Sequence, residues 1–175
     1  PTTPYDAKGL LKTSLRSDDP VLFLEHQSLL NVKGTGPEEE YTIPFGQARV
    51  CREGDDVTVV ALGPMVAKTS ALCDELAADG ISVELIDPRS IAPLDTETIF
   101  RSVSKTGRLL IVDEAFGPCG IGAEISAQIV ERCFDQLDAP VRRLNGAHSP
   151  TPFSPSLESA VIPQPDQIAL AIRNI

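Results

Sequence analysis

The side chains best placed for chemistry are Asp113 and Glu114, an acidic pair that follows an apolar run and precedes a glycine-rich loop. The run, 109–112, is uninterrupted, which is typical of a strand buried on both faces of a parallel sheet. Ligands and partner surfaces collect at the carboxyl ends of such strands. Most paired carboxylates are solvated or structural, so we expect these two to cap a helix or to anchor the loop backbone.

The loop after this pair contains Gly117, Gly120 and Gly122. Glycines at the start of a helix let backbone N–H groups approach a phosphate. The dinucleotide fingerprint G-x-G-x-x-G, however, follows the first strand of a βαβ unit, whereas this loop follows a late strand and lacks the third glycine. We therefore expect a tight turn with close helix packing and no cofactor-binding residues.

Four further residues, His148, Ser149, His26 and Cys119, have side chains that could take part in catalysis. His148 lies in a proline-stiffened loop after the last predicted strand, where loops often line clefts. Its neighbour Ser149 would point to the opposite side, and no G-x-S-x-G elbow is present, so a hydrolase triad is not indicated. His26 follows an apolar run and is expected to be structural. Cys119 precedes a helix, where a thiolate can be stabilised, and is the one candidate for a reactive cysteine.

Composition excludes several classes of function. The 175 residues carry a formal charge of −10, which repels nucleic acid and attracts a basic protein partner. No apolar run is long enough to cross a bilayer, and the first residues lack a signal-peptide pattern, so no membrane association is expected. The four cysteines show no C-x-x-C spacing and, with two histidines, make a poor zinc set, so no metal site is expected.

Hydrophobic periodicity predicts an α/β fold with an open, mostly parallel five-stranded sheet and helices on both faces. The first predicted helix and strand cannot enclose a core by themselves, so they must pack on something else. Residues 31–40 have the composition of a linker. The predicted elements are helix 6–16, begun by an Asp6 cap, strand 21–24, strand 48–52, strand 57–62, helix 65–78, strand 81–86, helix 96–103, strand 109–112, helix 121–133, strand 140–144 and a terminal helix ending at 175.

Several motifs, in this order, resemble the C-terminal half of the β subunit of thiamine-diphosphate-dependent 2-oxoacid dehydrogenases, the E1 component. They are PYDAKGLL at 4–11, PVLFLEH at 20–26, YTIPFGQA at 41–48, GDDVTVV at 54–60, KTGRLLIVDEA at 105–115, GIGAEI at 120–125 and DAPVR at 138–142. The resemblance implies that residues 1–30 are the tail of a pyrimidine-binding domain, 31–40 a linker and 41–175 a transketolase C-terminal-like domain.

The resemblance also implies a function. The intact enzyme would decarboxylate a 2-oxoacid, by default pyruvate, and pass the acyl group to lipoyl-E2. Its thiamine diphosphate and Mg²⁺ would be bound outside this chain, so no catalytic, cofactor-binding or metal-binding residue is expected here, and the 175 residues alone would be inactive.

Expected partners are the E1 α subunit, a second β subunit and the basic peripheral subunit-binding domain of E2. Asp138 and the terminal carboxylate of Ile175 are the implied E2 contacts. The enzyme would work in the bacterial cytoplasm, or in the mitochondrial matrix of a eukaryote.

Alternative functions stay open. Transketolase and 1-deoxyxylulose-5-phosphate synthase end in a domain of the same layout, and a non-enzymatic acidic docking module would show the same charge. The substrate is also open, because residues 147–155 resemble acetoin-dehydrogenase β subunits and the segment ERCF at 131–134 is shared with branched-chain enzymes.

Overall fold

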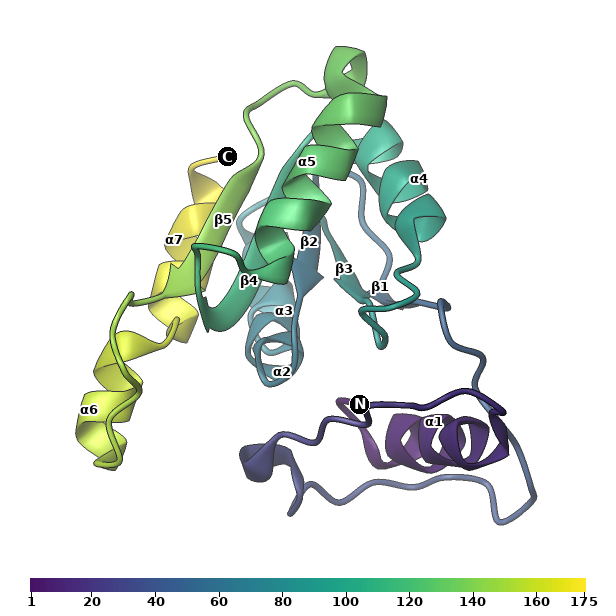
Figure 1. Cartoon of the computed structure of the whole chain (residues 1–175). Helices are drawn as coiled ribbons and strands as arrows, with labels where there is room; N and C mark the ends of the chain where they lie inside the picture. The colour runs from purple at the N-terminus through teal and green to yellow at the C-terminus, as the bar shows by residue number, and fades with distance from the viewer.

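The computed structural model describes residues 1–175 and consists of seven α-helices, two short 3₁₀ helices and five strands (Figure 1). In chain order they are α1 (Pro4–Arg16), η1 (Gln27–Leu29), β1 (Arg49–Arg52), β2 (Val57–Ala61), α2 (Met65–Ser70), α3 (Cys73–Ala78), β3 (Val83–Asp87), α4 (Thr96–Thr106), β4 (Leu109–Phe116), α5 (Ile121–Cys133), η2 (Phe134–Gln136), β5 (Arg142–Gly146), α6 (Pro155–Val161) and α7 (Pro165–Arg173). None of the helices has the length and apolar character needed to span a membrane.

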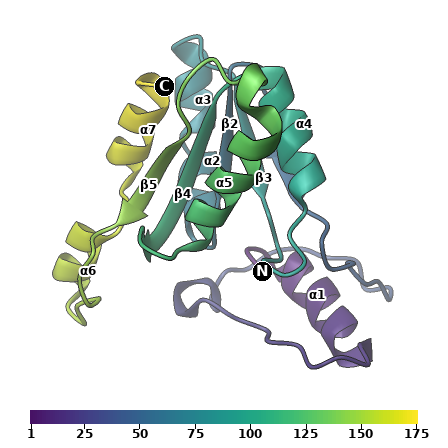
Figure 2. The same ribbon diagram turned by 45° about the horizontal axis from the view of Figure 1, so that its top comes forward.

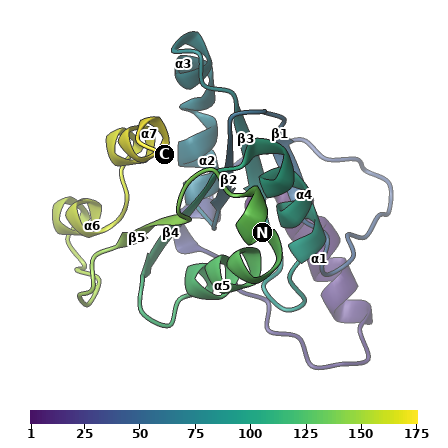
Figure 3. The ribbon, with the colours of Figure 1, turned by 90° about the horizontal axis from the view of Figure 1, so that it is seen from above.

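The five strands form one open sheet in the order β1-β3-β2-β4-β5. Only β1 is antiparallel to its neighbour, whereas the pairs β2–β3, β2–β4 and β4–β5 are parallel. Helices α4 and α5 cover one face, and α2, α3 and α7 cover the other (Figures 1 and 3). The predicted fold class, an open and mostly parallel five-stranded sheet covered on both faces, is confirmed.

Each face of the sheet contributes to its own apolar layer because side chains alternate along a strand. Along β2, Val57 and Val59 face α2, α3 and α7, and Val60 faces α4 and α5. All residues of β2 and β3 are buried, which explains why these strands have no polar alternation in the sequence. Full burial of each Val, Leu or Ile side chain contributes about 1.5–3 kcal/mol.

Polar groups also connect the sheet to α4. The hydroxyl of Thr58, in the middle of β2, lies 2.6 Å from that of Ser102 and 2.8 Å from that of Thr106. Glu84 of β3 accepts a hydrogen bond from Lys105 and another from the backbone N–H of Gly54, at 3.3 Å. These bonds satisfy buried polar groups that would otherwise destabilise the core, and they set the position of α4 along the sheet.

The first 45 residues lie apart from the sheet layers, beyond the carboxyl ends of the parallel strands (Figures 1 and 2). Helix α1 packs on the segment that follows it: the Tyr5 and Tyr41 rings stack with centroids 4.5 Å apart. Ile43 is buried against Gly9, where a Cβ would lie 2.6 Å from its side chain. The hydroxyl of Thr13 donates to the Ile43 carbonyl at 2.7 Å. The glycine in α1 therefore permits this close contact.

Several predicted elements differ from the structure. The strand predicted at 21–24 is absent, and Leu22 and Leu24 are 92% and 73% exposed, because no neighbouring strand lies beside them. The helix predicted at 65–78 is divided between α2 and α3, where Leu72 N–H bonds to the Thr69 carbonyl and tightens the turn. The side chain of Thr3, and not of Asp6, caps α1, at 3.1 Å from the Asp6 N–H.

Two further differences lie near the carboxyl edge of the sheet. Strand β4 continues past the predicted end at Val112 to Phe116, because Asp113 and Phe116 still pair with β5. The loop predicted after β5 contains the additional helix α6, which begins at Pro155 in the first-turn position that favours proline.

Glu84 should make the stability of the fold depend on pH. Burial acts to raise the pKa of Glu84, but hydrogen bonds from Lys105, Ser102 and Gly54 outweigh it and hold the pKa below its ordinary value of 4.5. The charged form therefore stabilises the fold above that value, and the contribution is lost as the pH falls through the folded-state pKa. Glu84→Gln should cost about 2 kcal/mol of unfolding free energy at pH 7 and much less at pH 3.

Urea unfolding of both proteins at the two pH values measures this difference. Glu97→Gln is the matched control, because the Glu97 side chain is 68% exposed in its pair with Arg132 and should cost at most about 0.5 kcal/mol. An equal cost of Glu84→Gln at both pH values would show that the Glu84 charge does not stabilise the fold.

Candidate functional site

The two edges of the sheet differ in what lies beside them. In Figure 1 the arrows of β2 and β5 run downward, so the carboxyl ends of the parallel strands lie on the side of the sheet where α1 is drawn. The amino ends lie on the opposite side, near the C-terminus of the chain (Figures 1 and 2). The candidate residues Asp113, Glu114, Cys119 and His148 belong to the carboxyl edge, whereas Asp138 and Ile175 belong to the amino edge.

At the carboxyl edge, the acidic pair after the buried part of β4 has structural roles. Asp113 is buried, which raises the pKa of its carboxyl, and its Oδ1 accepts the Ala115 N–H at 3.0 Å. Glu114 Oε1 lies 2.7 Å from Nε2 of His26. The other ring nitrogen of His26 accepts the Ser28 N–H at 3.2 Å. This geometry agrees with the expected backbone anchoring by Asp113. Glu114 does not anchor the loop backbone but contacts His26, which ties the N-terminal residues to β4.

The glycine loop that follows is a packing turn. A Cβ on Gly122 would lie 3.3 Å from the Ile111 side chain, and Gly120 is the N-cap of α5 with an extended backbone. The guanidinium of Arg143 donates to the Gly117 carbonyl at 3.3 Å. Exposed Cys119 has a φ of 59°, in the left-handed region that favours glycine. Close helix packing, as predicted, accounts for the glycines.

His148 and Ser149 do not form a catalytic pair. The His148 ring contacts the Phe116 ring, with centroids 5.2 Å apart. The backbone N–H of Ser149 donates to the Ala147 carbonyl at 2.8 Å, and both residues are exposed. The chain brings no base to the Ser149 hydroxyl.

The strongest electrostatic feature is a network of buried ion pairs that joins α1 to β1 and β3. The fully buried Asp6 carboxylate lies 3.2 Å from Nη1 of Arg49 through Oδ2 and 2.7 Å from Nη2 of Arg89 through Oδ1. Nη2 of Arg49 is also 3.3 Å from Oδ2 of Asp87. The same Asp87 oxygen accepts a hydrogen bond from the hydroxyl of Thr2. Residues from three separate parts of the chain therefore meet in one charged cluster.

Arg89 joins this network at the cost of a strained backbone. Arg89 has a φ of 60°, a conformation that costs a side-chain-bearing residue about 1–2 kcal/mol. Its N–H donates to Asp87 Oδ1 at 2.9 Å. The close contact of Asp6 Oδ1 with Arg89 is not aligned as a hydrogen bond, and the Nε atoms of Arg49 and Arg89 are also unbonded. Removing the Asp6 charge would leave the Arg89 guanidinium without an ion-pair partner and Arg49 with Asp87 alone.

Sequence reasoning missed this network. It treated Asp6 as a helix cap and residues 87–90 as a loop. The available signal was a pair of charged residues at the end of a buried strand: Asp87 is the last residue of β3, and Arg89 follows two residues later. Charges in such a position need partners. The partner in α1 could not be identified from spacing.

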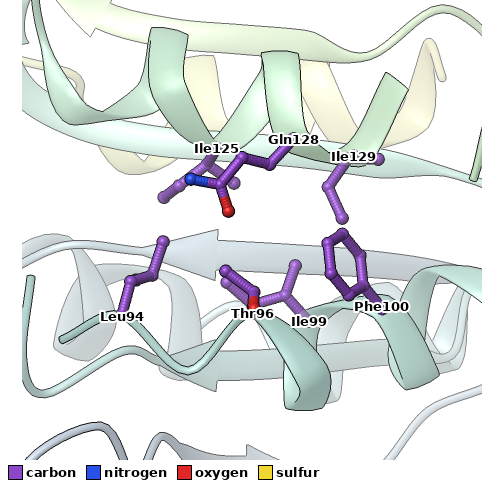
Figure 4. Close-up of a pocket in the computed structure, with 7 residues that line it drawn as sticks. All are labelled: Leu94, Thr96, Ile99, Phe100, Ile125, Gln128 and Ile129. Carbon is purple, nitrogen blue, oxygen red and sulfur yellow. The ribbon is translucent and has the colours of Figure 1, made fainter. Parts of the chain in front are cut away.

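The residues of this chain do not fit thiamine diphosphate with Mg²⁺. No group of three or more His, Cys, Asp or Glu side chains is placed to hold a metal ion. The groove between α4 and α5 has no room for a water molecule (Figure 4) and is lined by Leu94, Thr96, Ile99, Phe100, Ile125, Gln128 and Ile129. A cavity of about 290 Å³ lies within residues 1–32, and Glu25 and His26 are its only titratable side chains. We therefore assign no reaction step to this chain.

At the amino edge, Asp138 lies between η2 and β5 and is exposed. Its N–H donates to the Gly107 carbonyl at 2.8 Å, which joins the turn before β5 to the turn before β4. The Asp138 carboxylate lies over the Cα of Gly107 and has no ion-pair partner in the chain. It is available to a partner.

Ile175 ends the chain at the same edge. Its side chain packs against the apolar layer of α2, α3 and α7. Two residues earlier, Nη2 of Arg173 lies 2.6 Å from Asp79 and 2.8 Å from Glu75, which ties the end of α7 to α3. The terminal residue is thus held on the side of the sheet where Asp138 lies.

Asp6→Asn tests the buried network. The change should remove the negative charge that Arg49 and Arg89 share as an ion-pair partner. It should lower the free energy of detaching α1 from the sheet by about 3 kcal/mol. Amide hydrogen exchange of residues 7–16 should accelerate strongly, while exchange in β2 and β4 should not change. Asp18→Asn, at an exposed residue after α1, is the control. Unchanged protection of α1 in Asp6→Asn would mean that the network does not hold the helix.

Comparisons with known proteins agree with this fold. Residues 46–168 match the family model described as transketolase, C-terminal domain. The β subunit of acetoin:2,6-dichlorophenolindophenol oxidoreductase from Bacillus subtilis (strain 168) is 47% identical over 168 residues, 96% of this chain and 49% of that protein. The β subunit of the pyruvate dehydrogenase E1 component from Porphyra purpurea is 47% identical over 174 residues, 99% of this chain and 53% of that protein.

A solved structure gives the same result. A split-gene transketolase, described as an inactive β4 tetramer, matches with a TM-score of 0.68 at 25% identity, covering 82% of this chain and 45% of that one. The chain spans about half the length of the curated relatives it matches. On these grounds the chain belongs to the transketolase C-terminal domain family and is similar, over nearly its whole length, to the β subunits of 2-oxoacid dehydrogenase E1 components.

Proposed function

We propose that this chain is the C-terminal assembly portion of an E1 β subunit. The intact enzyme, with thiamine diphosphate and Mg²⁺ bound by its other parts, decarboxylates a 2-oxoacid and passes the acyl group to lipoyl-E2. The observation that carries the proposal is the similarity of nearly the whole chain to E1 β subunits at 47% identity.

The proposed partners divide between the two edges of the sheet. The E1 α subunit and a second β subunit complete the enzyme, and the basic peripheral subunit-binding domain of E2 docks at the amino edge. Asp138 is exposed there without an intramolecular cation, and Ile175, the other proposed contact, packs against the apolar layer at the same edge. The net charge of −10 favours a basic partner at this surface. The enzyme works in the bacterial cytoplasm or the mitochondrial matrix.

The proposed substrate is pyruvate. Acetoin is the second candidate, because a relative named for acetoin is as similar to this chain as the pyruvate dehydrogenase subunit is. Transketolase chemistry has weaker support, since the matching split-gene transketolase is 25% identical.

Steady-state assays of the holoenzyme, containing the α subunit and the complete β subunit, decide the substrate. With 2,6-dichlorophenolindophenol as electron acceptor, kcat/KM should be higher for pyruvate than for acetoin or a branched-chain 2-oxoacid. Preferred turnover of acetoin would replace the pyruvate proposal. The 175 residues alone should show no activity and no heat of binding with thiamine diphosphate and Mg²⁺, and micromolar affinity would contradict an assembly role.

Charge reversal at Asp138 tests the docking edge. Asp138→Lys should weaken binding of an E2 peripheral subunit-binding domain about tenfold at low salt, and the effect should shrink at high salt because exposed charges are screened. Isothermal titration calorimetry measures both affinities. Asp18→Lys is the control, because it changes the net charge by the same amount at a residue after α1, beyond the carboxyl edge. Equal affinities of the two variants at low salt would remove Asp138 from the docking surface.

A further inference from the structure

Two helices end at the amino edge with a glycine in the left-handed region: Gly107 is the C-cap of α4, and Gly80 follows Asp79, the C-cap of α3. Gly107 ends α4 with a φ of 67° and its N–H donates to the Val103 carbonyl at 2.8 Å. Gly80 follows α3 with a φ of 82° and its N–H donates to the Ala77 carbonyl at 3.0 Å. Both residues have the left-handed backbone for which glycine carries no steric penalty. A side chain at either position would meet the backbone strain of a positive φ.

The two caps differ in the space above them. A Cβ at Gly80 would have nothing within 4 Å, whereas a Cβ at Gly107 would lie 2.8 Å from Cγ of Asp138 and still closer to its Oδ2. The Asp138 backbone cannot move away freely, because its N–H is bonded to the Gly107 carbonyl at 2.8 Å. Only rotation of the Asp138 side chain can relieve such a collision.

We infer that Gly107 is a positioning residue for the Asp138 carboxylate on the E2-docking surface. The missing side chain leaves the space in which the carboxylate lies, and the hydrogen bond between the two backbones fixes the distance. This inference rests on the proposed docking function of Asp138. Gly107 itself touches no partner and acts only through the orientation of the Asp138 carboxylate.

A double-mutant cycle with a matched glycine control tests the inference. The affinity of the chain for an E2 peripheral subunit-binding domain is measured at low salt for Gly107→Ala, Gly80→Ala, Asp138→Asn and the double variant of 107 and 138. Asp138→Asn should bind about tenfold more weakly, and Gly107→Ala about five- to tenfold. The double variant should bind no more weakly than Asp138→Asn alone, because the two changes remove the same contact. Gly80→Ala should stay within about twofold of the unchanged chain, although it too places a side chain at a positive φ.

Three-bond NMR couplings report χ1 of Asp138 without a partner, and this angle should change in Gly107→Ala and not in Gly80→Ala. An unchanged χ1, or binding of Gly107→Ala as tight as that of Gly80→Ala while Asp138→Asn is weakened, would overturn the positioning role alone. An unchanged affinity of Asp138→Asn would overturn the docking contact and this inference with it.

Discussion

The buried ion pairs among Asp6, Arg49, Asp87 and Arg89 decide which surfaces of the molecule remain free. Burying charges is costly, and a cluster of this kind is stable only when every charge is paired. Helix α1 is therefore held beyond the carboxyl ends of the parallel strands, and the contact of His26 with Glu114 ties a second segment there. Open α/β sheets commonly bind small ligands at this edge. Here the chain's own first 45 residues lie beside it.

The amino edge has the opposite character. The turns before β4 and β5 meet there through the bond between Gly107 and Asp138, and the end of α7 is fastened by Arg173. These contacts hold turns and a chain end in fixed positions on a rigid scaffold. Fixed acidic groups suit recognition of a basic partner, because electrostatic complementarity contributes mainly to specificity and association rate. The two edges thus support a division between internal anchoring and external docking.

The order of strands and helices could be predicted because it depends on local signals. Apolar runs such as 109–112 identify buried strands, and Gly107 marks the end of α4. The strand predicted at 21–24 failed because a strand requires a neighbour, and periodicity does not say whether one is present. The partners of Asp6 were missed for a related reason: ion pairs between residues far apart in the chain leave no regular spacing. Asp113 was recognised because its position after a buried run is itself a local signal.

The most direct test of this division is a hydrogen-exchange footprint of an E2 peripheral subunit-binding domain on the chain. If the partner docks at the amino edge, amide exchange should become slower on binding at Gly107, Asp138 and residues 173–175. Exchange at His26 and at residues 114–117, on the carboxyl edge, should not change. Slower exchange at His26 and residues 114–117, with none at the amino edge, would contradict the account.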